Sequence, residues 1–162
     1  MFSDEIKTLA AEILILCRAK GLKIATAESC TGGLIIGALT EITGSSDVVD
    51  RGFVTYTNRA KMECLGLSAD TLKIDGAVSP EVAIAMTKGA IKYSSANIAV
   101  SVTGIAGPDG GSDHKPVGLV YMAVIKRGGE ALHQMHKFGD LGRDKVREVT
   151  IIAALKLLKE II

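Results

Sequence analysis

The chain has 162 residues, of which 48% are hydrophobic and only 4% aromatic, and its formal net charge at pH 7 is +1. This length suits a single domain, residues 1–162, with a large aliphatic core. The small net charge and the scattered aromatic residues argue against a nucleic-acid partner. No apolar run is long enough to span a membrane, and the acidic N-terminus is unlike a signal peptide, so we expect neither.

The first part of the chain alternates between helical and strand patterns. Apolar residues recur at helical spacing over residues 4–20, and Gly21 fits the end of that helix. The apolar stretch Leu22–Thr26 predicts a strand. Residues 31–42 predict a second helix, which the cluster Thr43–Ser46 ends.

The middle of the chain predicts another strand and two helices. The residues Phe53–Tyr56 favour a strand, and Asn58 is a suitable N-cap for a short helix that ends at Gly66. Ser79, followed by a proline and an acidic residue, indicates the start of a helix that runs to about Tyr93.

The last part of the chain predicts three strands and a final helix. Residues 98–103 form a buried strand pattern that leads into the glycine-rich loop 104–111. Residues 117–126 and 130–138 flank an Arg-Gly-Gly turn and predict a hairpin, and residues 144–160 are an amphipathic helix. One hairpin among strands otherwise separated by helices predicts a mixed sheet between two helical layers.

The segment Ala27–Gly33 carries the strongest functional signal. It places Ser29 where a strand gives way to a helix, a position that exposes a side chain at the carboxyl end of a strand. Its glycines let a ligand approach backbone N–H groups at the helix start. A helix capped by a hydroxyl residue, with no ligand, would have the same pattern.

A serine hydroxyl needs a base to become a nucleophile, and two kinds are present. Three histidines lie late in the chain, in no context that supports a catalytic triad: His114, His133 and His136. Lys61 is the alternative if burial keeps its amine neutral. If the strand at Phe53–Tyr56 lies beside the first strand, Tyr56 and Lys61 reach Ser29. From spacing alone, a solvated helix lysine is the more common outcome.

Other residues near Ser29 have two readings each. Cys30 is a competing nucleophile, although a small buried cysteine at a helix start is more often a packing residue. Glu28 is either an acid or a partner for a backbone donor or a cation. Tyr56 either relays a proton or simply packs its ring at the rim of the site. With Cys17 and Cys64, the thiols cannot all pair and lack metal-binding spacing, so we expect a reduced, cytoplasmic protein.

The glycine-rich loop after the third strand is a second candidate region. Residues Thr103–Gly111 can supply N–H donors to an oxyanion or a phosphate. Asp109, Asp113 and His114 could be metal ligands, but a solvated loop is favoured because they form no closed ligand set.

Four motifs occur in register along the chain. They are Ala27–Gly33, Tyr56–Asn58 with Lys61, Gly76–Ser79, and Thr103–Pro108 with Lys115–Gly118. This set closely resembles the CinA C-terminal domain family, over essentially the whole chain. Stand-alone members of that family are nicotinamide-nucleotide amidohydrolases. The resemblance implies a three-layer α/β/α sandwich with a mixed, mainly parallel five-stranded sheet.

The resemblance also implies a reaction, the hydrolysis of the carboxamide of nicotinamide mononucleotide to nicotinate mononucleotide and ammonia. It makes Ser29 the nucleophile and Lys61 the base, with Tyr56 as its helper, and it requires no metal or cofactor. Candidates for binding the oxyanion or ligand are Cys30, Thr31, Gly32, Gly33, Thr103, Gly104 and Gly107. Candidates for binding the phosphate are Lys115, Arg143 and Arg147.

Two other functions are compatible with the same sequence. One is a module that binds a pyridine nucleotide without hydrolysing it, and the other is an accessory interaction domain that has lost its ligand. We expect the partner to be a small-molecule nucleotide substrate, and neither a nucleic acid nor a membrane. An exposed edge hairpin would also permit a homodimer or a higher homo-oligomer.

Overall fold

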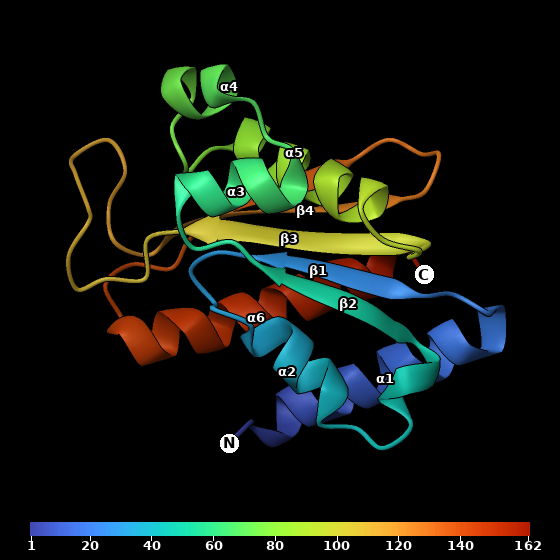
Figure 1. Ribbon diagram of the computed structural model, residues 1–162. Coiled ribbons are helices and arrows are strands. Elements are labelled where there is room, and N and C mark those ends of the chain that lie inside the picture. The colour runs from blue at the N-terminus through green and yellow to red at the C-terminus, as the bar shows by residue number, and fades with distance from the viewer.

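A five-stranded mixed sheet, in the order β2-β1-β3-β4-β5, lies between two layers of helices (Figure 1). The structure, a computed structural model, describes every residue from 1 to 162. The strands are β1 (Ile24–Glu28), β2 (Val49–Val54), β3 (Ile98–Gly104), β4 (Leu119–Lys126) and β5 (Leu132–Lys137). Strand β1 pairs in parallel with β2 and β3, and β4 pairs antiparallel with β3 and β5. The predicted three-layer α/β architecture is confirmed.

The helices divide between the two faces of the sheet, as Figure 1 shows. One layer holds α1 (Asp4–Lys20), α2 (Leu34–Thr40) and α6 (Arg143–Glu160). The other holds α3 (Asn58–Leu65), α4 (Ala69–Ile74) and α5 (Pro80–Lys92), and a short 3-10 turn spans Ser45–Asp47. Each layer encloses its own hydrophobic cluster, of 25 and 12 buried residues respectively. No helix combines the length and the apolar character that crossing a membrane requires.

The first helix and the first strand meet at a tight cap. The Gly21 backbone is left-handed, with φ at 62°, and the Leu22 N–H donates to the Cys17 carbonyl at 2.9 Å. Leu22 therefore belongs to the end of α1, and β1 begins at Ile24, two residues later than the sequence predicts.

The other boundaries differ from prediction for similarly local reasons. Helix α2 begins at Leu34 because Gly32 and Gly33 have φ of 61° and 94°, which a right-handed α-helix does not adopt. Strand β2 ends at Val54, and Thr57, one residue before the predicted cap, caps α3 through its hydroxyl. Helix α4 is not predicted, although its cap, Ser68, is a residue type that starts helices.

Candidate active site

Ser29 lies where the carboxyl ends of three parallel strands meet. It directly follows β1, and β1 lies between β2 and β3. The Ser29 N–H donates to the Val102 carbonyl of β3 at 3.1 Å, so the backbone of Ser29 continues the ladder of the sheet. All five β1 residues are buried, which fixes the direction in which the chain leaves the sheet.

A cavity of about 270 Å³ opens at this edge of the sheet. Most of the residues that the sequence singles out line it, and none of the three histidines does. The predicted site residues that line the cavity are Ser29, Cys30, Tyr56, Lys61, Thr103, Gly104, Gly107 and Arg143. The sequence assigned no role at this cavity to Ala77 or Val78, and it read Asp109 as a solvated loop residue.

Lys61 is buried at the bottom of this site, with only 1% of its surface exposed. Its Nζ lies 3.0 Å from the Ser29 Oγ and 2.8 Å from the Thr55 carbonyl oxygen. Burial lowers the pKa of Lys61, and the nearby Cys30 thiol opposes that shift only in part. The alternative of a solvated helix lysine is therefore wrong. A neutral amine at hydrogen-bond distance from a serine hydroxyl can accept its proton.

The Cys30 thiol is a packing residue in this geometry. It is 6% exposed, and burial raises its pKa to about 12. The thiol is therefore protonated at neutral pH and is a weak nucleophile. The serine hydroxyl, not the thiol, has the buried amine beside it.

The residues between β1 and α2, which we call the Ser29–Gly33 turn, form a compact loop. The Gly32 N–H donates to the Ser29 carbonyl at 3.0 Å, and the Gly33 N–H donates to the Glu28 carboxylate at 3.0 Å. These two amides are thus engaged within the chain. The N–H groups of Cys30 and Thr31 donate to no backbone oxygen of the protein.

Glu28 is the partner of these backbone donors, which decides between its two predicted readings. Its carboxylate is wholly buried and accepts five hydrogen bonds. Two come from the hydroxyls of Thr26 and Thr31, and three from the backbone N–H groups of Gly33, Ile35 and Ile36. The start of α2 is therefore occupied by a carboxylate and does not bind a phosphate.

The β3 side of the cavity is built by close backbone packing. The Thr103 hydroxyl donates to the Ala77 carbonyl at 2.6 Å, which ties β3 to the segment before α5. A Cβ on Gly104 would lie 2.7 Å from a Val120 methyl group, and one on Gly107 would lie 2.7 Å from a Val117 methyl group. These glycines allow the end of β3 and the glycine-rich loop to approach β4 and the residues just before it closely.

Tyr56 and Arg143 meet at the rim of the cavity. The Arg143 Nη2 donates to the Tyr56 hydroxyl at 2.7 Å, and its Nη1 donates to the Gly107 carbonyl at 2.9 Å. Tyr56 is 55% exposed and makes no hydrogen bond to Lys61 or Ser29. The arginine, at the start of α6, thus joins the segment between β2 and α3 to the glycine-rich loop.

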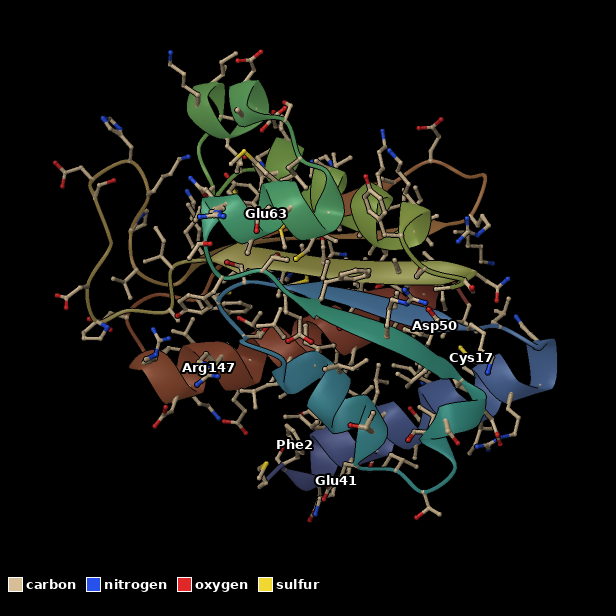
Figure 2. All side chains as sticks on the ribbon, in the orientation of Figure 1. Phe2, Cys17, Glu41, Asp50, Glu63 and Arg147 are labelled. Atoms are coloured by element: carbon tan, nitrogen blue, oxygen red, sulfur yellow. The ribbon has the colours of Figure 1, made fainter.

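The other two predicted phosphate ligands do not line this cavity. The Lys115 Nζ donates to the Asp75 carbonyl at 3.0 Å, which ties the segment after the glycine-rich loop to the end of α4. The Arg147 Nη2 donates to the Thr31 carbonyl at 3.0 Å, and Figure 2 shows this arginine on α6. Arg147 borders a separate cavity with Phe2 and Leu34. No group of three His, Cys, Asp or Glu side chains is placed to hold a metal.

Comparison with known proteins places the chain in a family. The family model for the CinA C-terminal domain matches residues 6–162. A protein described as nicotinamide-nucleotide amidohydrolase PncC, from Escherichia coli K12, is 44% identical over 98% of this chain and 95% of its own length. A protein described as a putative competence-damage inducible protein, from Caldicellulosiruptor saccharolyticus, is 47% identical over the whole chain.

The match extends to solved structures. The crystal structure of the competence/damage inducible protein CihA from Agrobacterium tumefaciens superposes with a TM-score of 0.97, at 54% identity, over 99% of this chain and 97% of that one. The chain spans 39% of the length of the Caldicellulosiruptor protein, so most of that relative's sequence has no counterpart in this chain. The chain belongs to the CinA C-terminal domain family.

Proposed function

We propose that this protein is an amidohydrolase that converts nicotinamide mononucleotide to nicotinate mononucleotide and ammonia. The observation that carries the proposal is the buried Lys61 amine, 3.0 Å from the Ser29 hydroxyl, inside a cavity at the edge of the sheet. The name of the E. coli relative, which matches over nearly its whole length, supports the choice of substrate.

The first half of the reaction forms an ester on Ser29. The hydroxyl oxygen attacks the carboxamide carbon while neutral Lys61 takes the hydroxyl proton. The lysine then returns this proton to the amide nitrogen, the carbon–nitrogen bond breaks, and ammonia leaves. The nicotinoyl group remains bound to the Ser29 oxygen.

The second half hydrolyses that ester. A water molecule attacks the acyl carbon as Lys61 accepts a proton from it, and the bond to the Ser29 oxygen breaks. The proton on Lys61 returns to Ser29, which restores the hydroxyl and the neutral amine. Nicotinate mononucleotide is released, and the protein's proton balance is unchanged over the cycle apart from the ionisation of the product.

The oxyanion of each tetrahedral intermediate needs fixed donors. We assign the oxyanion to the N–H groups of Cys30 and Thr31, which adjoin Ser29 and donate to no backbone oxygen, since those of Gly32 and Gly33 are engaged with oxygens of the protein. Gly104 lies inside β3, where it pairs with Val120 of β4, so we assign the Thr103–Gly104 backbone to the cavity wall.

The phosphate of the substrate is assigned to the rim of the cavity. Arg143 lines the cavity and uses one nitrogen on the Tyr56 hydroxyl and another on the Gly107 carbonyl. The Tyr56 oxygen accepts from the arginine, so its own hydroxyl proton can be donated to a ligand. We assign Tyr56 to substrate binding beside Arg143, because it has no contact with Lys61 that would relay a proton.

Purified protein and nicotinamide mononucleotide provide the test. We expect ammonia and nicotinate mononucleotide in equal amounts, with release abolished in Ser29→Ala. Thermal stabilisation by the nucleotide without any ammonia would favour the binding module. The absence of both thermal stabilisation and turnover would favour the accessory interaction domain.

A further inference from the structure

Thr31 is held by two charged side chains that approach from different elements. Its hydroxyl donates to the Glu28 carboxylate at 2.7 Å, and its carbonyl accepts from the Arg147 guanidinium at 3.0 Å. Thr31 itself is fully buried and lies in the middle of the Ser29–Gly33 turn. Both contacts therefore act on the segment that carries Ser29.

The turn needs such contacts because its own backbone is intrinsically flexible. Gly32 and Gly33 both adopt left-handed conformations, and glycine can leave them for many other conformations at little cost. Within the turn, the one backbone bond that spans it joins Gly32 to Ser29. Backbone N–H groups of Leu34 and Gly37 tie the turn to α2 by donating to the Thr31 and Gly33 carbonyls, and side chains from outside the turn add to this rigidity.

Glu28 supplies one of these contacts. A wholly buried carboxylate is costly unless it is fully hydrogen bonded, and five donors satisfy this one. Two of the donors, the Thr31 hydroxyl and the Gly33 N–H, belong to the turn, and two others belong to α2. The carboxylate thus joins the turn to the helix that follows.

Arg147 supplies the other contact from α6. Its Nε is buried without a partner, and its Nη2 donates to the Thr31 carbonyl. A Cβ on Gly32 would lie 3.4 Å from the same Nη2, so the guanidinium packs against the turn itself. Figure 2 marks this residue on α6, and it does not line the cavity that holds Ser29.

We propose that Glu28 and Arg147 are positioning residues that hold the Ser29–Gly33 turn through Thr31. They keep the Ser29 hydroxyl beside Lys61 and keep the Cys30 and Thr31 N–H groups in the orientation that the oxyanion requires. The inference rests on the proposed function. It also gives Arg147 a role in the chemical step, not in binding the phosphate.

Thr31→Val tests the Glu28 contact, with Thr31→Ser as the matched control. Valine has the shape of threonine without the hydroxyl, whereas serine keeps the hydroxyl that donates to Glu28. We expect Thr31→Val to lower kcat by about tenfold or more, with KM changed by less than about twofold, and Thr31→Ser, which keeps the donating hydroxyl, to lower kcat several-fold less than Thr31→Val. Equal kcat values for the two variants would overturn the role of this contact.

Arg147→Met tests the second contact, with Arg143→Met as its control. If Arg147 positions the turn, its variant lowers kcat for nicotinamide mononucleotide and nicotinamide riboside by the same factor. The Arg143 variant should instead raise KM for the mononucleotide and reduce the preference for it over the riboside. A loss of that preference in Arg147→Met would show that Arg147 binds the phosphate and would reject the positioning role.

A measurement that needs no turnover separates this inference from the proposed function. Amide hydrogen exchange of residues 29–36 should be faster in Arg147→Met and Thr31→Val than in the wild type, and unchanged in Arg143→Met and Thr31→Ser. If exchange changes in the four variants as expected but the wild type releases no ammonia, the positioning role of Glu28 and Arg147 stands and the proposed function fails. Exchange that is the same in the wild type and all four variants would overturn the positioning role of Glu28 and Arg147.

Discussion

The Ser29 Oγ and the Lys61 Nζ lie 3.0 Å apart, although 32 positions separate the two residues along the chain. Two different secondary-structure elements bring these side chains together. Ser29 is fixed by the end of β1, and Lys61 lies in the first turns of α3, which Thr57 caps through its hydroxyl. The parallel pairing of β1 with β2 places the ends of both segments at one edge of the sheet.

Replacing Ser29 should remove the activity without unfolding the protein. We expect Ser29→Ala to lower kcat by a factor of about 1,000 or more, since the nucleophile is lost, and Cys30→Ala to be far milder. Ammonia release and thermal unfolding of both variants provide the measurement. A reversal of this order would make the Cys30 thiol the nucleophile.

The activity should rise with pH as Lys61 loses its proton. Because burial lowers the pKa of Lys61, the neutral amine forms at a lower pH than it would for a free lysine. The kcat/KM profile of the wild type should therefore show a rising limb whose apparent pKa lies below 10.5. Lys61→Arg should be inactive across the profile, because a guanidinium stays protonated. A fully active arginine variant would reject Lys61 as the base.

The same pKa shift predicts how stability depends on pH. The folded-state pKa of Lys61 lies below its unfolded value, so the unfolded chain binds more protons in the window between the two values. The free energy of unfolding should rise with pH through that window. Below the window, the destabilisation caused by burying Lys61 should be at its full value. Lys61→Met should be more stable than the wild type at neutral pH, with a smaller difference near pH 10. Urea unfolding of both proteins at several pH values measures this difference.

The order of strands and helices follows from local sequence patterns, and so do several of the caps. Ser79 with Pro80 marks the start of α5, and the structure has that helix begin at Pro80 with Ser79 as its cap. Boundaries next to turns were less predictable. The pattern at Leu22 is that of a strand, but the residue completes the cap of α1 through a backbone bond that a pattern does not contain.

The site was predictable in its central residues and not in its supporting ones. Ser29 and Lys61 have residue types that suit the chemistry, so their motifs point to them. The positions of Arg143 and Arg147 depend on how α6 crosses the end of the sheet, which no local spacing encodes. These residues are four positions apart on one helix, yet Arg143 lines the cavity and Arg147 contacts the far side of the Ser29–Gly33 turn.

Discrimination by phosphate should depend on Arg143. A charge-assisted hydrogen bond from a guanidinium contributes roughly 1.5–3 kcal/mol, which corresponds to about tenfold or more in binding. We expect Arg143→Ala to lower kcat/KM for nicotinamide mononucleotide by at least about tenfold and to change that for nicotinamide riboside much less. Tyr56→Phe should have a smaller effect in the same direction, because the arginine remains. Equal efficiency of the wild type on both substrates would mean that no phosphate site exists here.

Gly89 should be required for the position of Lys61, although the two residues lie in different helices. A Cβ at this position of α5 would lie 2.2 Å from the Leu65 carbonyl oxygen at the end of α3. Alanine favours a helix over glycine by about 1 kcal/mol, but the contact with rigid backbone is the larger effect, since α3 must move away. We therefore expect Gly89→Ala to destabilise the fold by about 2 kcal/mol and to reduce kcat, as the shift of α3 draws Lys61 from Ser29.

Gly37 in α2 provides the matched control for Gly89, because it is also a helical glycine. A Cβ there would lie 3.4 Å from the tip of the flexible Phe2 side chain, an ordinary contact that can adjust. The helix propensity should then dominate, so Gly37→Ala should be neutral or stabilise the protein by up to about 1 kcal/mol. Urea unfolding gives both free energies, and ammonia release gives kcat. If Gly89→Ala is as stable and as active as Gly37→Ala, then the close approach of α5 to α3 does not hold Lys61 in place.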